Sequence, residues 1–444
     1  MRPYFIHQSV YDDVFTSDKN YYRKTTKRLQ FPKLTGEKDY DVIIVGGGLS
    51  GLATAYYLTQ KHDLKTALFE RHFIGWGASG RNGGQILPGY MAPATRMVRR
   101  FGFEKTRKLW EISVTGVNNI LRLIDRHKID CDLAPGAVTP IRPVHYHLPS
   151  IEKEMKLMER LGKPLELYDA VRTQEALSNT EDYYSAALVD KHNAWHFHPL
   201  KYANGLAKII AENADIYEDT PVIGIDNSGG KVTVFTPEGR ATASNVVLCG
   251  DSYLGQLVPK LRRKYVLIRN AMIATDKLPA KTNFMPENLC ASEYGGDLLF
   301  YRKTADNRLM IGGGDAVQPN AHMITSEQKI IDVLKDSMKT IFPQIGDIGI
   351  PYVWGGYIGV TTSYLPYTGC IDGNIYYMGG YSGHGVNLTH AFGRIFAEAI
   401  VENRDTTDTA LDLIRNMSLP GKGDFDVYLA RLGMFLESVK QRFD

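Results

Sequence analysis

Three glycines that follow a strongly apolar segment constrain the fold of this chain more than any other feature. Residues 41–45 (DVIIV) form a continuous apolar run rich in β-branched side chains, as expected for a strand buried on both faces. The glycines come next, in the spacing GxGxxG, at Gly46, Gly48 and Gly51. Residues 50–60 then have helical character, and residues 65–70 (KTALFE) form a second short apolar strand. Residues 41–70 therefore predict a βαβ unit.

The spacing of the glycines predicts a dinucleotide site. The first glycine permits a tight turn, the second lets a pyrophosphate approach the main chain, and the third lets helix and strand pack closely. The helix N-terminus then offers N–H groups and a partial positive charge to the phosphates. Glu70 ends the second strand 19 residues after Gly51, where a carboxylate would hold the adenosine ribose hydroxyls and disfavour the 2′-phosphate of NADP. FAD and NAD both remain open on this pattern.

The other strand signals predict how the chain is divided. Strands suited to one nucleotide-binding layer recur near residues 41, 66, 246 and 375, whereas residues 265–315 alternate apolar and polar side chains as in an antiparallel sheet. Residues 132–190 suggest strand-like pieces and loops, and helices are expected near 91–131, from 198, at 326–341 and at 386–402. We predict an α/β (α+β overall) fold, with a Rossmann-like domain built from discontinuous segments and an antiparallel-sheet substrate domain. The predicted division is an N-terminal extension at 1–40, a cofactor domain at 41–125, 191–262 and 351–444, and a substrate domain at 126–190 and 263–350.

Composition excludes several classes of protein. A net charge of +3 over 444 residues is too small for a nucleic-acid binder. The four cysteines form no CxxC pair, and neither HxH pair (His145/His147 and His196/His198) has a third ligand at zinc spacing, so no metal site is predicted. The start of the chain does not resemble a secretory signal, and no apolar stretch is long enough to span a bilayer, so we expect a cytoplasmic protein.

The C-terminal segment predicts an amphipathic helix. Its apolar stripe comprises Phe425, Leu429, Leu432, Leu436 and Val439. We expect this stripe to dock on the body of the protein, and contact with a membrane surface is the alternative.

The segment GWGASGRNGGQILPGY (75–90), together with the glycine turn before it, resembles the D-amino-acid-oxidase-type superfamily of FAD-dependent flavoproteins. Within that superfamily it is most similar to the γ-glutamylputrescine oxidase-like branch. The likeness continues through HPLKYANGLA (198–207), NVVLCGDSYLG (245–255), RLMIGGGD (308–315), WGGYIGVTTSYLPYTG (354–369) and GGYSGHGVNLTHAFGRI (379–395).

The resemblance implies an FAD site made from two glycine-rich segments far apart in the chain. Small residues at 77–84 would let the main chain lie beside the isoalloxazine ring. The helix after Gly383-His384-Gly385 would point its N-terminus at the N1–C2=O edge, where reduced flavin is negative. The expected cofactor residues are Gly46, Gly48, Leu49, Ser50, Gly51, Glu70, Arg71, Gly77, Ala78, Ser79, Arg81, Asn82, Gly83, Gly84, Gln85, Val222, Gly250, Gly383, His384, Gly385, Val386 and Asn387.

Two of these residues have more than one interpretation. Arg81 either neutralises the pyrophosphate, orders its own loop, or is a surface guanidinium. His384 is the candidate catalytic residue, and a packed loop histidine is the alternative.

At three positions this sequence differs from the relatives, and each difference changes the chemistry that the resemblance implies. Gly356 aligns with the cysteine that attaches flavin covalently in sarcosine oxidase-like proteins, so we expect non-covalent FAD. Met310 replaces a lysine that assists reaction with oxygen, and Asn387 replaces a lysine that clamps a substrate carboxylate. An amine whose charge lies further from the reacting carbon therefore fits better than a small α-amino acid.

The candidate substrate-binding residues are Tyr301, Arg302, Trp354 and Tyr357, for which packing within a sheet is the alternative. We expect an FAD-dependent oxidoreductase that moves hydride from the carbon of an amine C–N bond to flavin N5, giving an imine and then an aldehyde. Its partners would be a small-molecule amine and either O2 or another electron acceptor. The alternatives are an FAD-dependent amino-acid dehydrogenase that reduces a non-oxygen acceptor such as quinone, a redox-silent FAD-binding protein, and an NAD-only dehydrogenase.

Overall fold

The computed structural model describes residues 19–61, 64–295, 299–316 and 326–402. The apolar stripe predicted at 425–439 lies outside these residues. No helix within the described part is long and apolar enough to cross a membrane.

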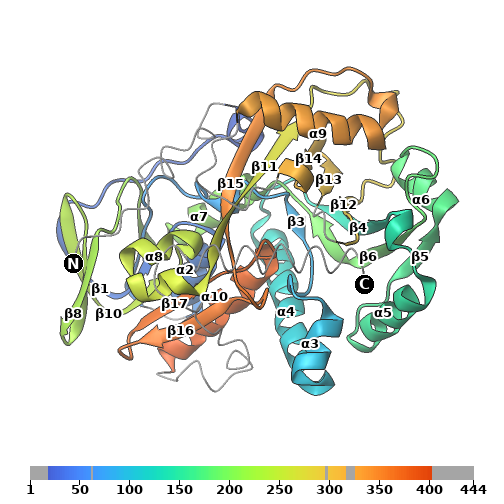
Figure 1. Cartoon of the computed structure of the whole chain (residues 1–444). Coiled ribbons are helices and arrows are strands. Elements are labelled where there is room, and N and C mark those ends of the chain that lie inside the picture. Colours follow the sequence, from blue (N-terminus) through green and yellow to red (C-terminus); the bar gives the residue numbers. More distant parts are fainter. Residues whose placement is uncertain (1–18, 62–63, 296–298, 317–325, 403–444) are drawn as a thin grey trace.

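An eight-stranded sheet forms the first layer (Figure 1). Its strands are β1 (Gly36–Val45), β2 (Thr66–Phe69), β7 (Ala214–Tyr217), β8 (Gly224–Gly229), β9 (Lys231–Phe235), β10 (Gly239–Leu248), β16 (Tyr367–Ile371) and β17 (Ile375–Gly379). The main order is β16-β17-β10-β1-β2-β7, with parallel pairing from β17 through to β7. The four strands predicted near residues 41, 66, 246 and 375 are thus neighbours, although β1 begins five residues earlier than the predicted strand.

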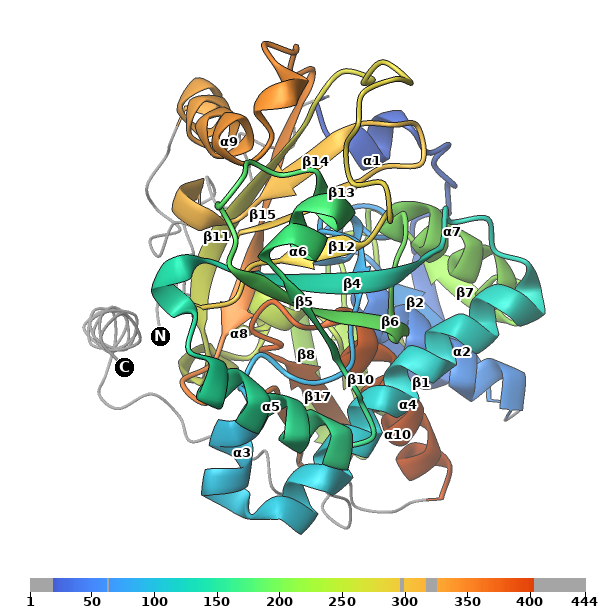
Figure 2. The same ribbon diagram turned by 90° about the vertical axis from the view of Figure 1, so that its right-hand side faces the viewer.

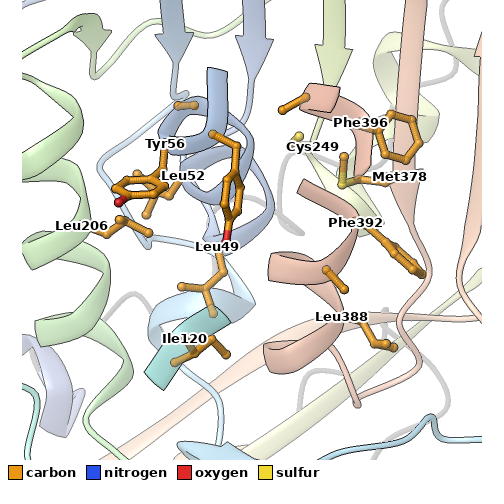
Figure 3. Close-up of a cluster of buried hydrophobic side chains, with 14 of the residues drawn as sticks. Leu49, Leu52, Tyr56, Ile120, Leu206, Cys249, Met378, Leu388, Phe392 and Phe396 are labelled. Atoms are coloured by element: carbon orange, nitrogen blue, oxygen red, sulfur yellow. The ribbon is translucent and has the colours of Figure 1, made fainter. Parts of the chain in front are cut away.

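The alternation of side chains along β1 explains why the segment is apolar throughout. Val42 and Ile44 belong to one buried cluster, whereas Ile43 and Val45 belong to another on the opposite face. The first face is covered by α2 (Leu49–Lys61), α4 (Phe103–His127), α7 (Pro199–Ile210) and α10 (Val386–Val401). Figure 3 shows Leu52, Ile120, Leu206 and Phe392 from these four helices in that cluster. The second face is covered partly by the β8–β9 hairpin and by α8 (Leu254–Leu257).

A second, nine-stranded sheet is mainly antiparallel. Its strands are β3 (Gln85–Ile86), β4 (Ala134–Ile141), β5 (Glu166–Asp169), β6 (Ala186–His196), β11 (Val266–Ala274), β12 (Cys290–Ser292), β13 (Phe300–Lys303), β14 (Leu309–Gly312) and β15 (Tyr352–Val360). Helix α9 (Glu327–Ile341) packs against β11, β14 and β15, with Ser326 as its N-cap (Figure 1). The predicted antiparallel sheet and the predicted α/β (α+β overall) fold class are both confirmed.

Two features differ from the sequence prediction. Strand β15 pairs with β11 in the second sheet, whereas residues 351–444 were assigned to the cofactor domain. The segment 132–190, expected to hold strands and loops, also contains α5 (Leu148–Arg160) and α6 (Ala170–Leu177). Figure 2 shows α5 beside the end of the sheet that carries β4, β5 and β6. Helix α5 is amphipathic, with Ile151, Met155 and Met158 on its inner side. Because extended segments precede and follow this short helix, its helical pattern of apolar residues is hard to recognise in the sequence.

The described part of the N-terminal extension packs over the second sheet and α7. Helix α1 (Tyr21–Lys24) buries both of its tyrosines, and Tyr22 lies edge-on to Trp354 with ring centroids 5.5 Å apart. Within the described residues, the remaining α-helix is α3 (Ala94–Phe101). Short 3-10 helices occupy Ala78–Gly80, Pro143–His145, Asp251–Tyr253, Pro259–Lys264, Gly314–Ala316 and Pro343–Ile345.

Candidate functional site

The two glycine-rich segments meet at one cavity of about 220 Å³. Ser50, from the first segment, and Tyr381, from the second, both line it and share a hydrogen bond of 2.9 Å between their hydroxyl oxygens. Helices α2 and α10, which begin at these segments, pack side by side (Figure 1). The site therefore joins the two ends of the described chain.

The glycine turn has the conformation that its spacing predicts. Gly46 has φ +117°, which L side chains rarely adopt. A Cβ at Gly51 would overlap the carbonyl oxygen of Gly46, and a Cβ at Gly48 would lie 2.8 Å from Ser79 Oγ. That Oγ accepts a hydrogen bond from the Leu49 N–H at 2.8 Å, so the loop at 77–84 reaches the start of α2.

Two helix N-termini face the cavity without any acidic side chain in their first turns. Leu49 begins α2 and Val386 begins α10, and both residues line the cavity. Each terminus has partial positive charge and main-chain N–H groups, which suit a pyrophosphate and an anionic ring edge. An FAD molecule has both of these groups, so the residues present fit this cofactor.

Glu70 lies at the end of β2 against the glycine turn. Its two oxygens accept hydrogen bonds from the main-chain N–H groups of Gly47, at 2.7 Å, and His72, at 2.8 Å. Each carboxylate oxygen can accept more than one hydrogen bond, so acceptor sites remain for ribose hydroxyls. Burial raises the pKa of Glu70 to about 7, and the main-chain hydrogen bonds oppose that shift.

Asp251, which follows β10, joins three parts of the cavity wall. Its carboxylate accepts a hydrogen bond from the Gly380 N–H at 2.6 Å, and the nearby main-chain N–H groups of Ser252, Gly359 and Tyr381 act to lower its pKa. Burial nevertheless raises the pKa of Asp251. Asp251 was not among the residues predicted from the sequence, although it follows Gly250 within a segment that carried the resemblance.

The loop at 77–84 is held in place from behind by residues of the second sheet. Arg302 donates to the carbonyl of Gly83 at 2.7 Å, and the Trp354 indole donates to that of Arg81 at 3.0 Å. Arg81 itself donates to the carbonyls of Trp76, at 2.7 Å, and Gly355, at 2.9 Å. Arg81 does not line the cavity, so its contacts favour the loop-ordering interpretation.

His384 lies between two cavity-lining glycines, Gly383 and Gly385. Burial, with a smaller contribution from Lys163, lowers the pKa of His384 to about 4, and hydrogen bonds to the main chain of Leu87 and Pro88 oppose that shift. The ring is therefore neutral at pH 7. Its buried Nε2 has no hydrogen-bond partner among the described residues.

A second cavity, of about 120 Å³, lies between α5 and the second sheet. It contains a lysine and two carboxylates, Lys163, Glu154 and Asp190, which belong to no motif in the sequence. Gln85 and Leu87 also line it, and they follow closely after Asn82, which lines the first cavity.

The structure places most of the predicted cofactor residues around the first cavity. Those that line it are Gly46, Gly48, Leu49, Ser50, Glu70, Arg71, Gly77, Ala78, Ser79, Asn82, Val222, Gly250, Gly383, Gly385 and Val386. Those that do not line it are Gly51, Arg81, Gly83, Gly84, Gln85, His384 and Asn387. Gly51 shapes the turn, while the buried Asn387 side chain donates to the carbonyls of Gly89 and Ser113, where α10 packs against α4.

None of the four predicted substrate residues lines either cavity. Arg302 and Trp354 position the loop described above. Tyr301 lies in the core of the second sheet, against Phe342, and its hydroxyl is 3.0 Å from that of Tyr184. Tyr357 packs in a small cluster of its own. The packing alternative that the sequence left open describes their positions better.

Neither HxH pair lies on one face of a strand. His196 ends β6, whereas His198 is the N-cap of α7, where its ring accepts a hydrogen bond from the Lys201 N–H. His145 ends a 3-10 helix and His147 precedes α5. Within the part of the chain that the structure describes, no group of three or more histidine, cysteine or acidic residues could hold a metal ion.

Comparison with known proteins agrees with this geometry. The family model DAO, described as FAD dependent oxidoreductase, matches residues 41–399. Gamma-glutamylputrescine oxidoreductase of Escherichia coli (strain K12) is 34% identical over 95% of this chain and 97% of its own. A probable oxidoreductase, OrdL, of Haemophilus influenzae is 31% identical over 90% of this chain and 91% of its own.

Solved structures share the fold at lower identity. L-proline dehydrogenase from P. horikoshii has a TM-score of 0.72 at 17% identity and covers 86% of this chain and 97% of its own. Glycine oxidase from Geobacillus kaustophilus has a TM-score of 0.70 at 19% identity and covers 86% of this chain and 100% of its own. With a glycine turn, two helix N-termini and a family match over most of its length, this chain belongs to the DAO family of FAD-dependent oxidoreductases.

Proposed function

We propose that this protein oxidises the C–N bond of a primary or secondary amine such as γ-glutamylputrescine, giving an imine that hydrolyses to an aldehyde. The observation that carries the substrate class is the similarity to gamma-glutamylputrescine oxidoreductase, which extends over 95% of this chain and 97% of the relative. The structure supports the redox half of the proposal, because the cavity residues fit FAD.

The residues of the chain act mainly by binding and by electrostatics. When bound, the isoalloxazine ring supplies the acceptor for a hydride from the carbon that bears the amine. The N-terminus of α10 stabilises negative charge that develops beside it during this transfer. Arg302 and Trp354 hold the carbonyls of Gly83 and Arg81, which orders the loop beside the cavity.

His384 contributes as a neutral ring. A pKa of about 4 means that the ring does not repel a cationic amine at pH 7, and its free Nε2 can accept a hydrogen bond from the amine N–H. The amine must lose its proton before hydride transfer, and a neutral ring of this pKa orients the amine N–H without taking up that proton.

We further propose that FAD is bound without a covalent link. Gly356 aligns with the cysteine that attaches flavin in sarcosine oxidase-like proteins, and a Cβ there would lie 3.5 Å from the Arg81 side chain. Cys249 is the one thiol among the described residues that line the cavity, and burial raises its pKa to about 12, which disfavours the thiolate. Acid precipitation should leave a colourless pellet and a yellow supernatant, and a yellow pellet would contradict the proposal.

Anaerobic reduction of the FAD-loaded protein tests the activity. A panel of γ-glutamylputrescine, putrescine, sarcosine, proline and glycine is added, and the loss of flavin absorbance near the visible maximum is followed. We expect γ-glutamylputrescine to bleach the flavin fastest. Bleaching by proline or glycine alone would instead support an amino-acid dehydrogenase, and no bleaching by any amine would support a redox-silent flavoprotein.

Readmission of air identifies the electron acceptor. Hydrogen peroxide formed in proportion to the amine consumed would support O2 as acceptor. Reoxidation by a quinone or dye without peroxide would support a dehydrogenase.

A further inference from the structure

The second cavity contains charges that the chemistry at the flavin does not require. Lys163 and Asp190 both line it and form an ion pair with a long N–O distance of 3.4 Å, and Glu154 also lines it. The Lys163 side chain is 14% exposed and that of Asp190 is 4% exposed, so both groups are largely removed from water. Charged groups at such depth are stable only with partners, and a loose pair leaves room for another ionic group.

Asp190 is held firmly through Oδ1, and its Oδ2 takes part only in the long ion pair with Lys163. Its Oδ1 accepts hydrogen bonds from the main-chain N–H groups of His192, at 3.1 Å, and Asn193, at 2.8 Å. Its Oδ2 is buried and makes no hydrogen bond within the described residues. The carboxylate is therefore fixed in orientation and has an open acceptor at the Lys163 side of the cavity.

The rest of the wall is also oriented in advance. Glu154 accepts a hydrogen bond from the Tyr294 hydroxyl at 2.8 Å with Oε2. The Gln85 side chain accepts from Ser292 Oγ at 2.8 Å and donates to the Ala291 carbonyl at 2.9 Å. One lysine and two carboxylates give these lining groups a net charge of −1 when all are ionised.

The position of the cavity links it to the cofactor site. Asn82 lines the first cavity, and Gln85 and Leu87, a few residues later, line the second. His384, between two glycines of the first cavity, interacts with the main chain of Leu87 and with the charge of Lys163. His384 therefore lies near residues of both cavities.

We propose that this second cavity binds the α-amino-acid head group of a γ-glutamyl amine, with the head-group carboxylate on Lys163 and its ammonium on Asp190 Oδ2 and Glu154. This inference rests on the proposed amine oxidation. A zwitterion satisfies both members of the loose ion pair, because each gains a partner of opposite charge. A plain diamine would instead place a second ammonium beside Lys163, and a neutral acyl group would leave both charges without a new partner.

Substitution of Lys163 separates the head group from the reacting amine. In the FAD-loaded Lys163→Met variant, we expect KM for γ-glutamylputrescine to rise by about 10-fold or more, with a nearly unchanged limiting rate of flavin reduction. N-acetylputrescine has the same amide and distal amine without the charged head, and its KM should stay within about 2-fold of the wild-type value. Lys156→Met, which removes an exposed lysine from α5, is the matched control and should change neither value.

Binding measured without turnover provides an independent test. γ-Glutamylmethylamide has the head group but no distal amine, and it should raise the thermal midpoint of the FAD-loaded wild-type and Lys156→Met proteins. The rise should be absent in Lys163→Met and in the nearly isosteric Asp190→Asn, which serves if the lysine variant does not fold. Equal effects of Lys163→Met on both amines, or stabilisation that persists in both variants, would overturn the inference. Lysine-dependent stabilisation together with no bleaching by any amine would retain the head-group site and reject the proposed function.

Discussion

The hydrogen bond between Ser50 and Tyr381 is expected to couple the two ends of the chain to FAD affinity. Both side chains are buried, at 5% and 7% exposure, and their hydroxyl oxygens are 2.9 Å apart. Ser50→Ala leaves the Tyr381 hydroxyl without this partner, and Tyr381→Phe does the same to Ser50.

The size of the effect follows from the burial of this pair. Leaving one buried hydroxyl without a partner costs about 1–3 kcal/mol, whereas removing both partners costs little more than removing one. If the loss falls on the FAD-binding conformation, the dissociation constant rises roughly 5-fold to 150-fold in each single variant. The double variant should bind FAD no more weakly than the single variant with the higher dissociation constant. The coupling energy between the two substitutions should therefore be about 1 kcal/mol or more.

Titration of the apoprotein with FAD, followed by quenching of flavin fluorescence, gives the four dissociation constants of this cycle. Urea unfolding of the same apoproteins separates loss of stability from loss of affinity. Tyr90→Phe is the matched control, because Tyr90 is a buried tyrosine that donates to the Leu109 carbonyl at 2.9 Å and lies outside the cavity lining. Simple additivity of the two single effects on FAD affinity would refute the reasoning, as would an effect of Tyr90→Phe of equal size.

Three further predictions concern the turn, a buried histidine and the loop. Gly51→Ala should purify with little bound FAD, because the new Cβ overlaps the Gly46 carbonyl; normal flavin content by absorbance would contradict this. Burial lowers the pKa of His390 to about 4. The stability contributed by its neutral form is therefore complete above pH 6.5, and the free energy of unfolding falls by about 3 kcal/mol as the pH drops towards 4. Between pH 7 and 5, the free energy of urea unfolding should fall less in His390→Gln than in the wild type. Equal falls in the two proteins would refute this role of His390. Arg302→Met should lower FAD retention and the thermal midpoint, because the Gly83 carbonyl loses its donor at a cost of about 1–3 kcal/mol; unchanged flavin content and midpoint would contradict this role.

Local backbone requirements explain why one cavity could be predicted from the sequence. A β-branched run followed by GxGxxG allows few conformations, so β1, the turn and α2 form where the pattern indicates. The glycines before α10 mark the second helix N-terminus in the same way. The resemblance then implied that these two segments share a cofactor, and the contact between Ser50 and Tyr381 confirms that they lie together.

Side-chain roles that depend on long-range packing could not be predicted in this way. Arg302 and Trp354 were expected to face the substrate, but they contact loop residues more than 200 positions earlier in the chain. Lys163 and Asp190 meet because α5 and β6 pack together, and α5 itself was not predicted. No short motif indicates that a lysine after one element will face an aspartate in another.

The closure of the cofactor site by residues at both ends of the described chain affects how the enzyme matures. Ser50 and Tyr381 are separated by 331 positions, so a ribosome has translated most of the message before the second wall of the cavity exists. A growing polypeptide can complete the glycine turn early but lacks α10 until late in synthesis. Loading with flavin is therefore expected after release, and a truncation before β17 should yield a colourless product even where its earlier strands have formed.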